Sequence, residues 1–125
     1  MFEITVDVTF SSGHALRGYR GKCENPHGHN YRVRVRLAGK ELNGIGLLYD
    51  FKDLKTMIRR ETDRLDHQYL NDLEPFQEIN PSAENLARVL FERIRGHLDS
   101  AGGGIAVKSV TVYETDTTAA KYSLD

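Results

Sequence analysis

Residues 27–37 decide the fold; they read His27-Gly28-His29-Asn30-Tyr31-Arg32-Val33-Arg34-Val35-Arg36-Leu37. From Tyr31 onward, apolar side chains alternate with arginines, a pattern typical of a β-strand with one buried face and one polar face. Residues 2–10 alternate in the same way, and their polar positions hold acidic residues and threonines. If the two strands pair antiparallel, acids face arginines across the pair and help to set its register.

Two amphipathic helices are predicted after this pair of strands. An apolar stripe runs through residues 51–65, and Asp50 is its expected N-cap. A second stripe begins after Pro81, with Ser82 as the expected N-cap, and the glycine run at 102–104 ends it.

Alternation returns in the last third of the chain, at residues 107–114 and 120–124. Its parity predicts that Val110 and Glu114 share one face and that Val107 lies on the other. The order strand, strand, helix, helix, strand, strand indicates an α+β fold, with a four-stranded antiparallel sheet and both helices on one face. An open sheet leaves two exposed edges, and we expect subunits to join edge to edge into a β-barrel.

The composition is that of an ordinary soluble domain. The chain has 125 residues, a formal net charge of −1 and one cysteine, which suits a single domain over residues 1–125 without disulfides. The charge gives no indication of nucleic-acid or membrane-surface binding, and no run approaches the ~18 apolar residues of a membrane span. Because the N-terminal segment already alternates like a strand and not like a leader peptide, we expect a cytoplasmic protein.

Three of the five histidines, His14, His27 and His29, fall in the first quarter of the chain. Residues two apart in a strand point to the same side, roughly 6.5–7 Å apart, so His27 and His29 can reach one ion. His14 has the parity of the buried face of the first strand, provided that no bulge follows Phe10. Three neutral imidazoles leave the fourth position of a zinc ion open, as in catalytic sites. An incidental His-x-His pair is the alternative.

Cys23 lies four residues before His27, close to Arg20 and Lys22. Cations and a nearby metal lower the pKa of a thiol and make thiolate available as a base, so Cys23 is a candidate catalytic group. Two alternatives stay open: an inert buried cysteine, and a fourth ligand that closes a structural zinc site. The glycine-rich, polar surroundings argue against a buried position.

Two other acidic positions are candidates for function. Asp66 precedes His67 directly, and an acid beside an imidazole can fix its tautomer and raise its basicity. Glu114 ends a strand on an apolar face, where a carboxylate needs a partner; a buried salt bridge or a glutamate at the rim is the alternative there. His97 is interpreted as a helix-end histidine that the helix dipole favours, without a function.

Five motifs stand in order along the chain: Phe10-Ser11-Ser12-Gly13-His14, Cys23-Glu24-Asn25-Pro26-His27-Gly28-His29-Asn30-Tyr31, Leu65-Asp66-His67-Gln68-Tyr69-Leu70-Asn71, Pro81-Ser82-Ala83-Glu84-Asn85-Leu86 and Val112-Tyr113-Glu114-Thr115. Together they resemble the 6-pyruvoyl-tetrahydropterin synthase family, over the chain from about Phe2 to its end. The resemblance implies the tunnelling fold, a Zn²⁺ cofactor, a pterin triphosphate substrate, and a homo-oligomer that closes a barrel as a trimer or a homohexameric dimer of trimers.

The resemblance also implies a role for each candidate residue. By motif position, the chain has zinc ligands at His14, His27 and His29, a catalytic thiol at Cys23, a relay pair from a neighbouring subunit at Asp66 and His67, and a pterin anchor at Glu114. The anchor role has a chemical reason, because a carboxylate can accept two parallel hydrogen bonds from the pterin amide and amine.

Within the family, a cysteine followed by three residues and His-Gly-His is similar to the bacterial 6-carboxy-tetrahydropterin synthases of queuosine biosynthesis. That branch is a zinc-dependent carbon–carbon lyase. It converts 7,8-dihydroneopterin triphosphate to 6-carboxy-5,6,7,8-tetrahydropterin, acetaldehyde and triphosphate. Two other functions stay open: triphosphate elimination alone, as in the 6-pyruvoyl enzymes, and a noncatalytic pterin- or metal-binding module. Arg17, Arg20 and Lys22 are candidate triphosphate contacts, with a solvated basic loop as the alternative.

Overall fold

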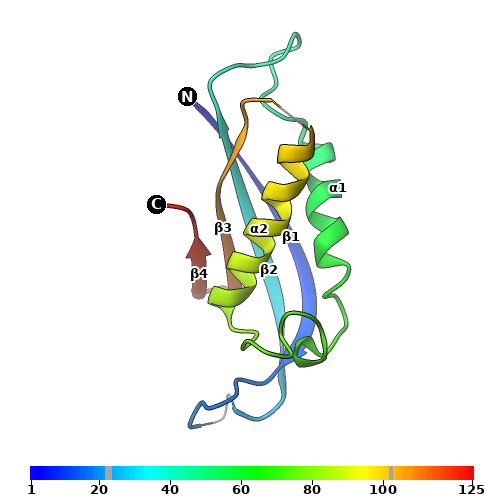
Figure 1. The fold of residues 1–125 in the computed structure, drawn as a ribbon, viewed down its shortest axis with the longest axis vertical. Helices are drawn as coiled ribbons and strands as arrows, with labels where there is room; N and C mark the ends of the chain where they lie inside the picture. Colours follow the sequence, from blue (N-terminus) through cyan, green and yellow to red (C-terminus); the bar gives the residue numbers. More distant parts are fainter. Residues whose placement is uncertain (22–23, 102) are drawn as a thin grey trace.

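The computed structural model describes residues 1–21, 24–101 and 103–125, and in these ranges the chain forms four strands and two long helices (Figure 1). The elements follow in the order β1 (Phe2–His14), β2 (His27–Gly39), α1 (Phe51–Thr62), the short 3-10 helix η2 (Leu70–Asp72), α2 (Ala83–Ala101), β3 (Ala106–Thr115) and β4 (Thr118–Tyr122). Within the described ranges, neither α1 nor α2 combines the length and apolar character that crossing a bilayer requires.

The strands form one antiparallel sheet in the order β1-β2-β3-β4. Between β1 and β2 the register runs without a shift from Phe2 opposite Gly39 to His14 opposite His27. The uninterrupted parity that the metal-site hypothesis needs is therefore present. The predicted charge pairing is confirmed at Asp7, which lies 2.9 Å from the Arg34 guanidinium, a contact that lowers the pKa of the Asp7 carboxyl.

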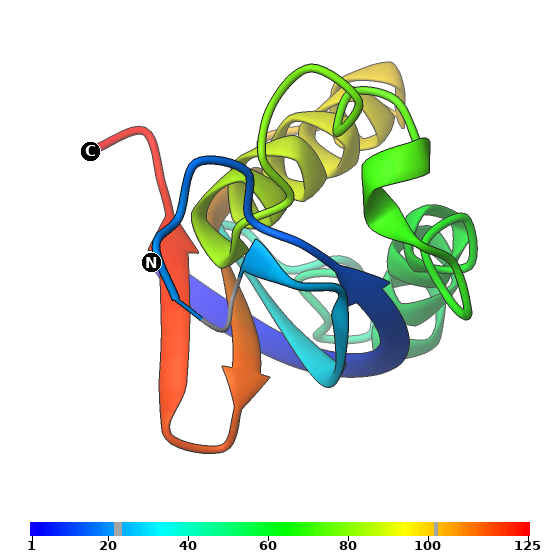
Figure 2. The same ribbon diagram turned by 90° about the horizontal axis from the view of Figure 1, so that it is seen from below.

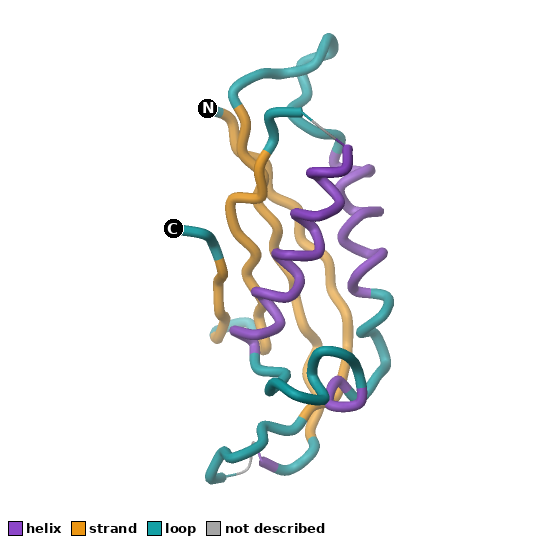
Figure 3. The backbone as a smooth tube through the Cα atoms, in the orientation of Figure 1, coloured by secondary structure: helices purple, strands orange, loops and turns teal. Residues whose placement is uncertain are grey.

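Both helices cover the same face of the sheet (Figures 2 and 3). This confirms the predicted α+β arrangement. The core lies between these layers. It contains inward side chains of β1, β2, β3 and both helices, and Ala120 and Tyr122 of β4 pack against it. Leu54 and Ile58 of α1 are fully buried, whereas Phe51, which shares their stripe in the sequence, is 57% exposed. Phe51 begins the helix at its outer end, where the core no longer covers it.

Both predicted N-caps are confirmed. The Asp50 side chain accepts hydrogen bonds from the amides of Lys52 and Asp53, which satisfies two donors that the first turn of α1 leaves free. The Ser82 hydroxyl accepts from the amide of Asn85 at the start of α2 in the same way (3.1 Å).

Strand β3 departs from the predicted alternation. Val107 pairs with Leu37 and Ser109 pairs with Arg36, so one extra residue, Lys108, is inserted between them as a β-bulge. The bulge brings Val107 to the buried face together with Val110. The expectation that Val107 lies on the opposite face is therefore wrong, because parity is lost where a bulge adds a residue.

Candidate active site

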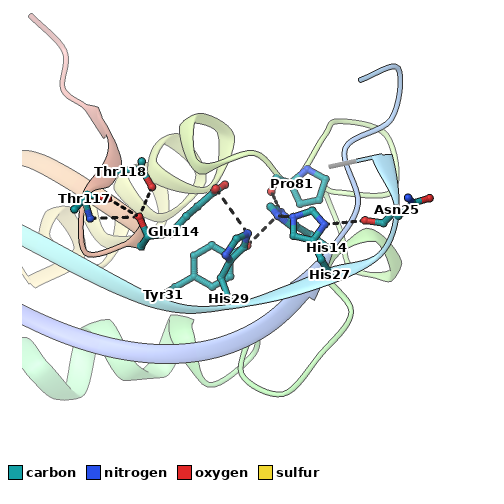
Figure 4. A network of polar contacts seen from close by, with 10 residues as sticks. His14, Asn25, His27, His29, Tyr31, Pro81, Glu114, Thr117 and Thr118 are labelled. Atoms are coloured by element: carbon teal, nitrogen blue, oxygen red, sulfur yellow. Dashed lines mark hydrogen bonds and ion pairs between the residues drawn. The ribbon is translucent and has the colours of Figure 1, made fainter. Parts of the chain in front are cut away.

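Three histidines converge at the end of the β1–β2 pair (Figure 4). In the register, His14 is opposite His27 and Ser12 is opposite His29, so all three imidazoles lie on the helix-covered face of the sheet. Their closest ring nitrogens all lie within 4.8 Å of one another. The predicted spatial cluster is thus present, and its spacing is one that a single metal ion can bridge.

Hydrogen bonds orient two of these rings. His14 Nδ1 lies 2.7 Å from the carbonyl oxygen of Pro81, and His27 Nδ1 lies 2.7 Å from that of Asn25. A carbonyl can only accept, so both Nδ1 atoms carry the proton and both Nε2 atoms present lone pairs. These Nε2 atoms are 2.9 Å apart. Two lone pairs at that distance repel each other unless a cation or an extra proton lies between them.

The third ring presents an unsatisfied nitrogen to the same place. His29 Nε2 is buried and has no hydrogen-bond partner among the described residues. Burial lowers the pKa of His14 and of His29, so both rings are held neutral, the state that ligates metals. Oriented lone pairs, a buried orphan nitrogen and neutral imidazoles together fit a bound divalent metal ion.

Glu114 borders this cluster. Its carboxylate Oε2 lies 3.7 Å from His29 Nε2 (Figure 4), and its side chain is 27% exposed. The register between β3 and β4 shifts between Tyr113 and Thr115, so Glu114 is the bulged residue, a common way to re-aim a side chain at a functional site. A hollow of about 200 Å³ opens beside it, lined by Ala83, Glu84, Glu114, Thr118, Ala119 and Ala120. The Glu114 carboxylate therefore lies at the rim of the site, close to His29 on one side and lining the small hollow on the other.

Asp66 and His67 form the predicted pair and are not part of the metal-ligand cluster, although His67 and His29 line the same open hollow of about 360 Å³. The amide of Ser11 donates to Asp66 Oδ1 (2.9 Å) and the amide of His67 donates to the Ser11 carbonyl (2.6 Å), which fastens the pair to the free edge of β1. The Ser11 amide is the main cause that lowers the pKa of Asp66. His67 Nδ1 is 3.0 Å from Asp66 Oδ2, and the His67 side chain is 83% exposed. The pair is oriented, and its imidazole faces outward.

In the basic loop between β1 and β2, Arg17 binds backbone of the protein itself, whereas the sequence made it a candidate triphosphate contact. Arg17 donates to the carbonyl oxygens of Phe76 (2.7 Å), Ile79 (3.3 Å) and Asn71 (3.4 Å), so its guanidinium fastens the loop to the segment before α2. No sequence pattern indicated this contact, because a side chain that binds distant carbonyls leaves no periodic signal. Cys23 and Lys22 lie outside the described residues.

Comparisons with known proteins agree with this geometry. The family model for 6-pyruvoyl tetrahydropterin synthase matches residues 3–125. A Bacillus subtilis protein named 6-carboxy-5,6,7,8-tetrahydropterin synthase is 32% identical, over 97% of this chain and 84% of its own length. A Synechocystis protein of the same name is 33% identical, over 98% and 93%. The solved structure of the Caenorhabditis elegans 6-pyruvoyl tetrahydropterin synthase superposes with a TM-score of 0.86 at 28% identity, covering 99% of this chain and 96% of that one. The chain belongs to the 6-pyruvoyl tetrahydropterin synthase family.

Proposed function

We propose that this protein is a zinc-dependent 6-carboxy-5,6,7,8-tetrahydropterin synthase. In this proposal it converts 7,8-dihydroneopterin triphosphate, with water, to 6-carboxy-5,6,7,8-tetrahydropterin, acetaldehyde and triphosphate, and acts in the cytoplasm on the way to queuosine. The observation that carries the proposal is the trio of His14, His27 and His29 beside the Glu114 carboxylate in a chain of this family.

The histidine trio is the proposed zinc site. Three neutral nitrogen ligands and an open fourth position suit a catalytic zinc ion. Zinc bound there would act as a Lewis acid toward the hydroxyl groups of the substrate side chain. Carbonyl groups of Pro81 and Asn25 hold two of the rings with Nε2 toward the site, which limits the reorganisation that metal binding requires.

Glu114 is the proposed pterin anchor. Its rim position and the adjacent hollow of about 200 Å³ leave its carboxylate accessible to a ring that enters from solvent. A carboxylate that accepts two parallel N–H bonds fixes the plane and direction of the pterin, so the side chain to be cleaved points toward the histidines.

Proton transfer is assigned to Cys23 and to the Asp66–His67 pair. Cys23 as thiolate would move a proton on the substrate side chain, and His67 would shuttle protons while Asp66 holds its Nδ1–H (3.0 Å). Because His67 faces outward from the edge of β1, we propose that it serves the site of a neighbouring subunit in a trimer or a hexamer. Strands β1 and β4 are the outer strands of the described sheet, and edges of this kind can pair with a neighbouring subunit.

The carboxy product is preferred over the 6-pyruvoyl product for two reasons. The chain has three residues between Cys23 and His27, the short spacing that resembles the carboxy branch. Relatives that carry the carboxy name are 28–33% identical to it. Triphosphate elimination alone remains the second candidate, since one Caenorhabditis elegans relative at 31% identity is named a putative 6-pyruvoyl tetrahydrobiopterin synthase.

Incubation of the zinc-loaded protein with 7,8-dihydroneopterin triphosphate, followed by mass identification of products, tests the proposal. Acetaldehyde and 6-carboxy-tetrahydropterin are expected in equal amounts. A pyruvoyl pterin without acetaldehyde would assign the second candidate, and unchanged substrate would indicate a noncatalytic binding module. In the Cys23→Ala variant, turnover should fall about 100-fold or more, as for loss of a general base, while zinc content stays at the wild-type level. Loss of zinc in that variant would instead make Cys23 a ligand.

A further inference from the structure

We infer that Asn71 and Asn80 are positioning residues that hold His14 in the orientation required for metal binding. The inference rests on the proposed function only in taking His14 as a metal ligand. Neither asparagine belongs to the histidine cluster, and both bind the backbone that directly follows His14, Asn71 at Ala15 and Asn80 at Arg17.

Just after the end of β1, the Asn71 side chain makes the two backbone hydrogen bonds that a neighbouring strand would otherwise make. Its Oδ1 accepts the amide of Ala15 (2.9 Å) and its Nδ2 donates to the carbonyl of Ala15 (2.9 Å). On the other side of His14, the amide of Gly13 donates to the carbonyl of Gln68 (3.0 Å). The backbone on both sides of His14 is therefore fixed by residues 68–71. These residues do not form a strand beside β1; their one β-bridge with it is between Gly13 and Tyr69.

Asn80 repeats the same paired contact two residues further along. Its Oδ1 accepts the amide of Arg17 (2.8 Å) and its Nδ2 donates to the carbonyl of Arg17 (2.9 Å). The carbonyl of Asn80 accepts from the side chain of Asn85 in α2 (2.9 Å). Asn80 thus ties the chain after His14 to the peptide of Pro81, whose carbonyl oxygen holds His14 Nδ1.

His14 depends on this arrangement more than His27 does. The ring of His27 is oriented by the carbonyl of Asn25, two residues away in the same segment. The ring of His14 is oriented by a carbonyl 67 positions away in the sequence, with the Tyr31 hydroxyl 3.2 Å from the same Nδ1. The side chains of Asn71 and Asn80, together with the Arg17 guanidinium, hold the two segments to each other at that point. Groups that hydrogen-bond directly to a ligand ring typically change metal affinity by about 10–100-fold when they are removed. Asn71 and Asn80 act one step further out, through the backbone around His14 and Pro81, so the lower end of this range is expected.

The test measures zinc affinity by competition with a chromophoric chelator in wild-type protein, Asn71→Ala and Asn80→Ala. Each variant is expected to raise the zinc Kd about 10-fold or more. Asn43→Ala is the matched control, because Asn43 also makes two side-chain hydrogen bonds to backbone, with the amides of Ile45 and Leu47, in a loop that contributes no ligand. Its zinc Kd should stay within about twofold of wild type, as for a surface change away from the site.

Two further readouts separate positioning from general loss of stability. Cobalt(II) replaces zinc and reports ligand geometry in its visible spectrum; the spectrum should change in Asn71→Ala and not in Asn43→Ala. Asn71→Asp keeps the acceptor for the Ala15 amide but places a carboxylate oxygen against the Ala15 carbonyl, so it should not restore wild-type affinity.

The outcomes distinguish this inference from the proposed function. Zinc affinity and cobalt spectra unchanged in both asparagine variants would overturn the inference while leaving the histidine site intact. Failure of the wild-type protein to bind zinc would instead overturn the proposed function.

Discussion

His14 and His29 share an environment that works against their protonation. Burial lowers the pKa of both rings, and for His29 the Glu114 carboxylate offsets only part of that effect. A histidine with a lowered pKa in the folded state is still neutral at a pH where a solvated imidazole, with a pKa of about 6.5, is already half charged. His14 and His29 therefore keep their metal-binding form under mildly acidic conditions.

This lowered pKa gives a prediction for the metal-free protein. The imidazole resonances of His14 and His29 in an NMR titration should have midpoints below about pH 6.5, the ordinary histidine value. Since the unfolded chain then binds more protons than the folded one, the free energy of unfolding should fall as the pH drops through this range. Single His14→Asn and His29→Asn variants assign the resonances. Midpoints above the ordinary value would contradict the burial that the structure shows.

At the scale of elements, α1 and α2 are joined by a buried carboxylate. Glu61 of α1 is only 3% exposed, and its Oε2 accepts a hydrogen bond from His97 Nε2 of α2 (2.8 Å). Arg93 and Arg64 lie 3.7 and 3.9 Å from the other carboxylate oxygen. The interpretation of His97 as a residue favoured by the helix dipole alone is incomplete, because its ring pairs with a charge on the other helix.

His97→Ala should lower the free energy of unfolding by about 1.5–3 kcal/mol, the range for hydrogen bonds to charged groups. The reason is that the carboxylate of Glu61 stays buried after its partner is removed. Urea unfolding measures the change. Arg64→Ala removes a more exposed and more distant contact with the same carboxylate and should cost less than about 1 kcal/mol. Equal losses of unfolding free energy in the two variants would show that the His97 contact stabilises the protein no more than the Arg64 contact does.

At the scale of the whole molecule, the outward position of His67 has a consequence for assembly. If its imidazole serves a neighbouring subunit, two inactive variants can complement each other. Co-expression of Cys23→Ala and His67→Ala subunits with different tags, followed by isolation of the mixed oligomer, should recover part of the wild-type activity. Mixed oligomers of Cys23→Ala and His14→Ala, both assigned to one subunit's site, should stay inactive. Recovery in neither mixture would place His67 in the site of its own subunit.

Much of the fold was predictable from local pattern. Alternation placed β1 and β2 and predicted that His14, His27 and His29 share a face, and the register confirms it. Caps at Asp50 and Ser82 marked the helix starts. These features are predictable because side-chain direction in a regular element follows from its period, and a cap satisfies donors only a few residues away.

Other features were decided by tertiary structure alone. The bulge at Lys108 moved Val107 into the core, and contacts of Asn71, Asn80 and Arg17 with distant backbone fixed the chain around His14. The physical reason is that an inserted residue or an amide side chain paired with remote backbone carries no periodicity. The sequence by itself thus determined which residues face one another across β1 and β2, while the tertiary structure decided how the His14 ring is aimed.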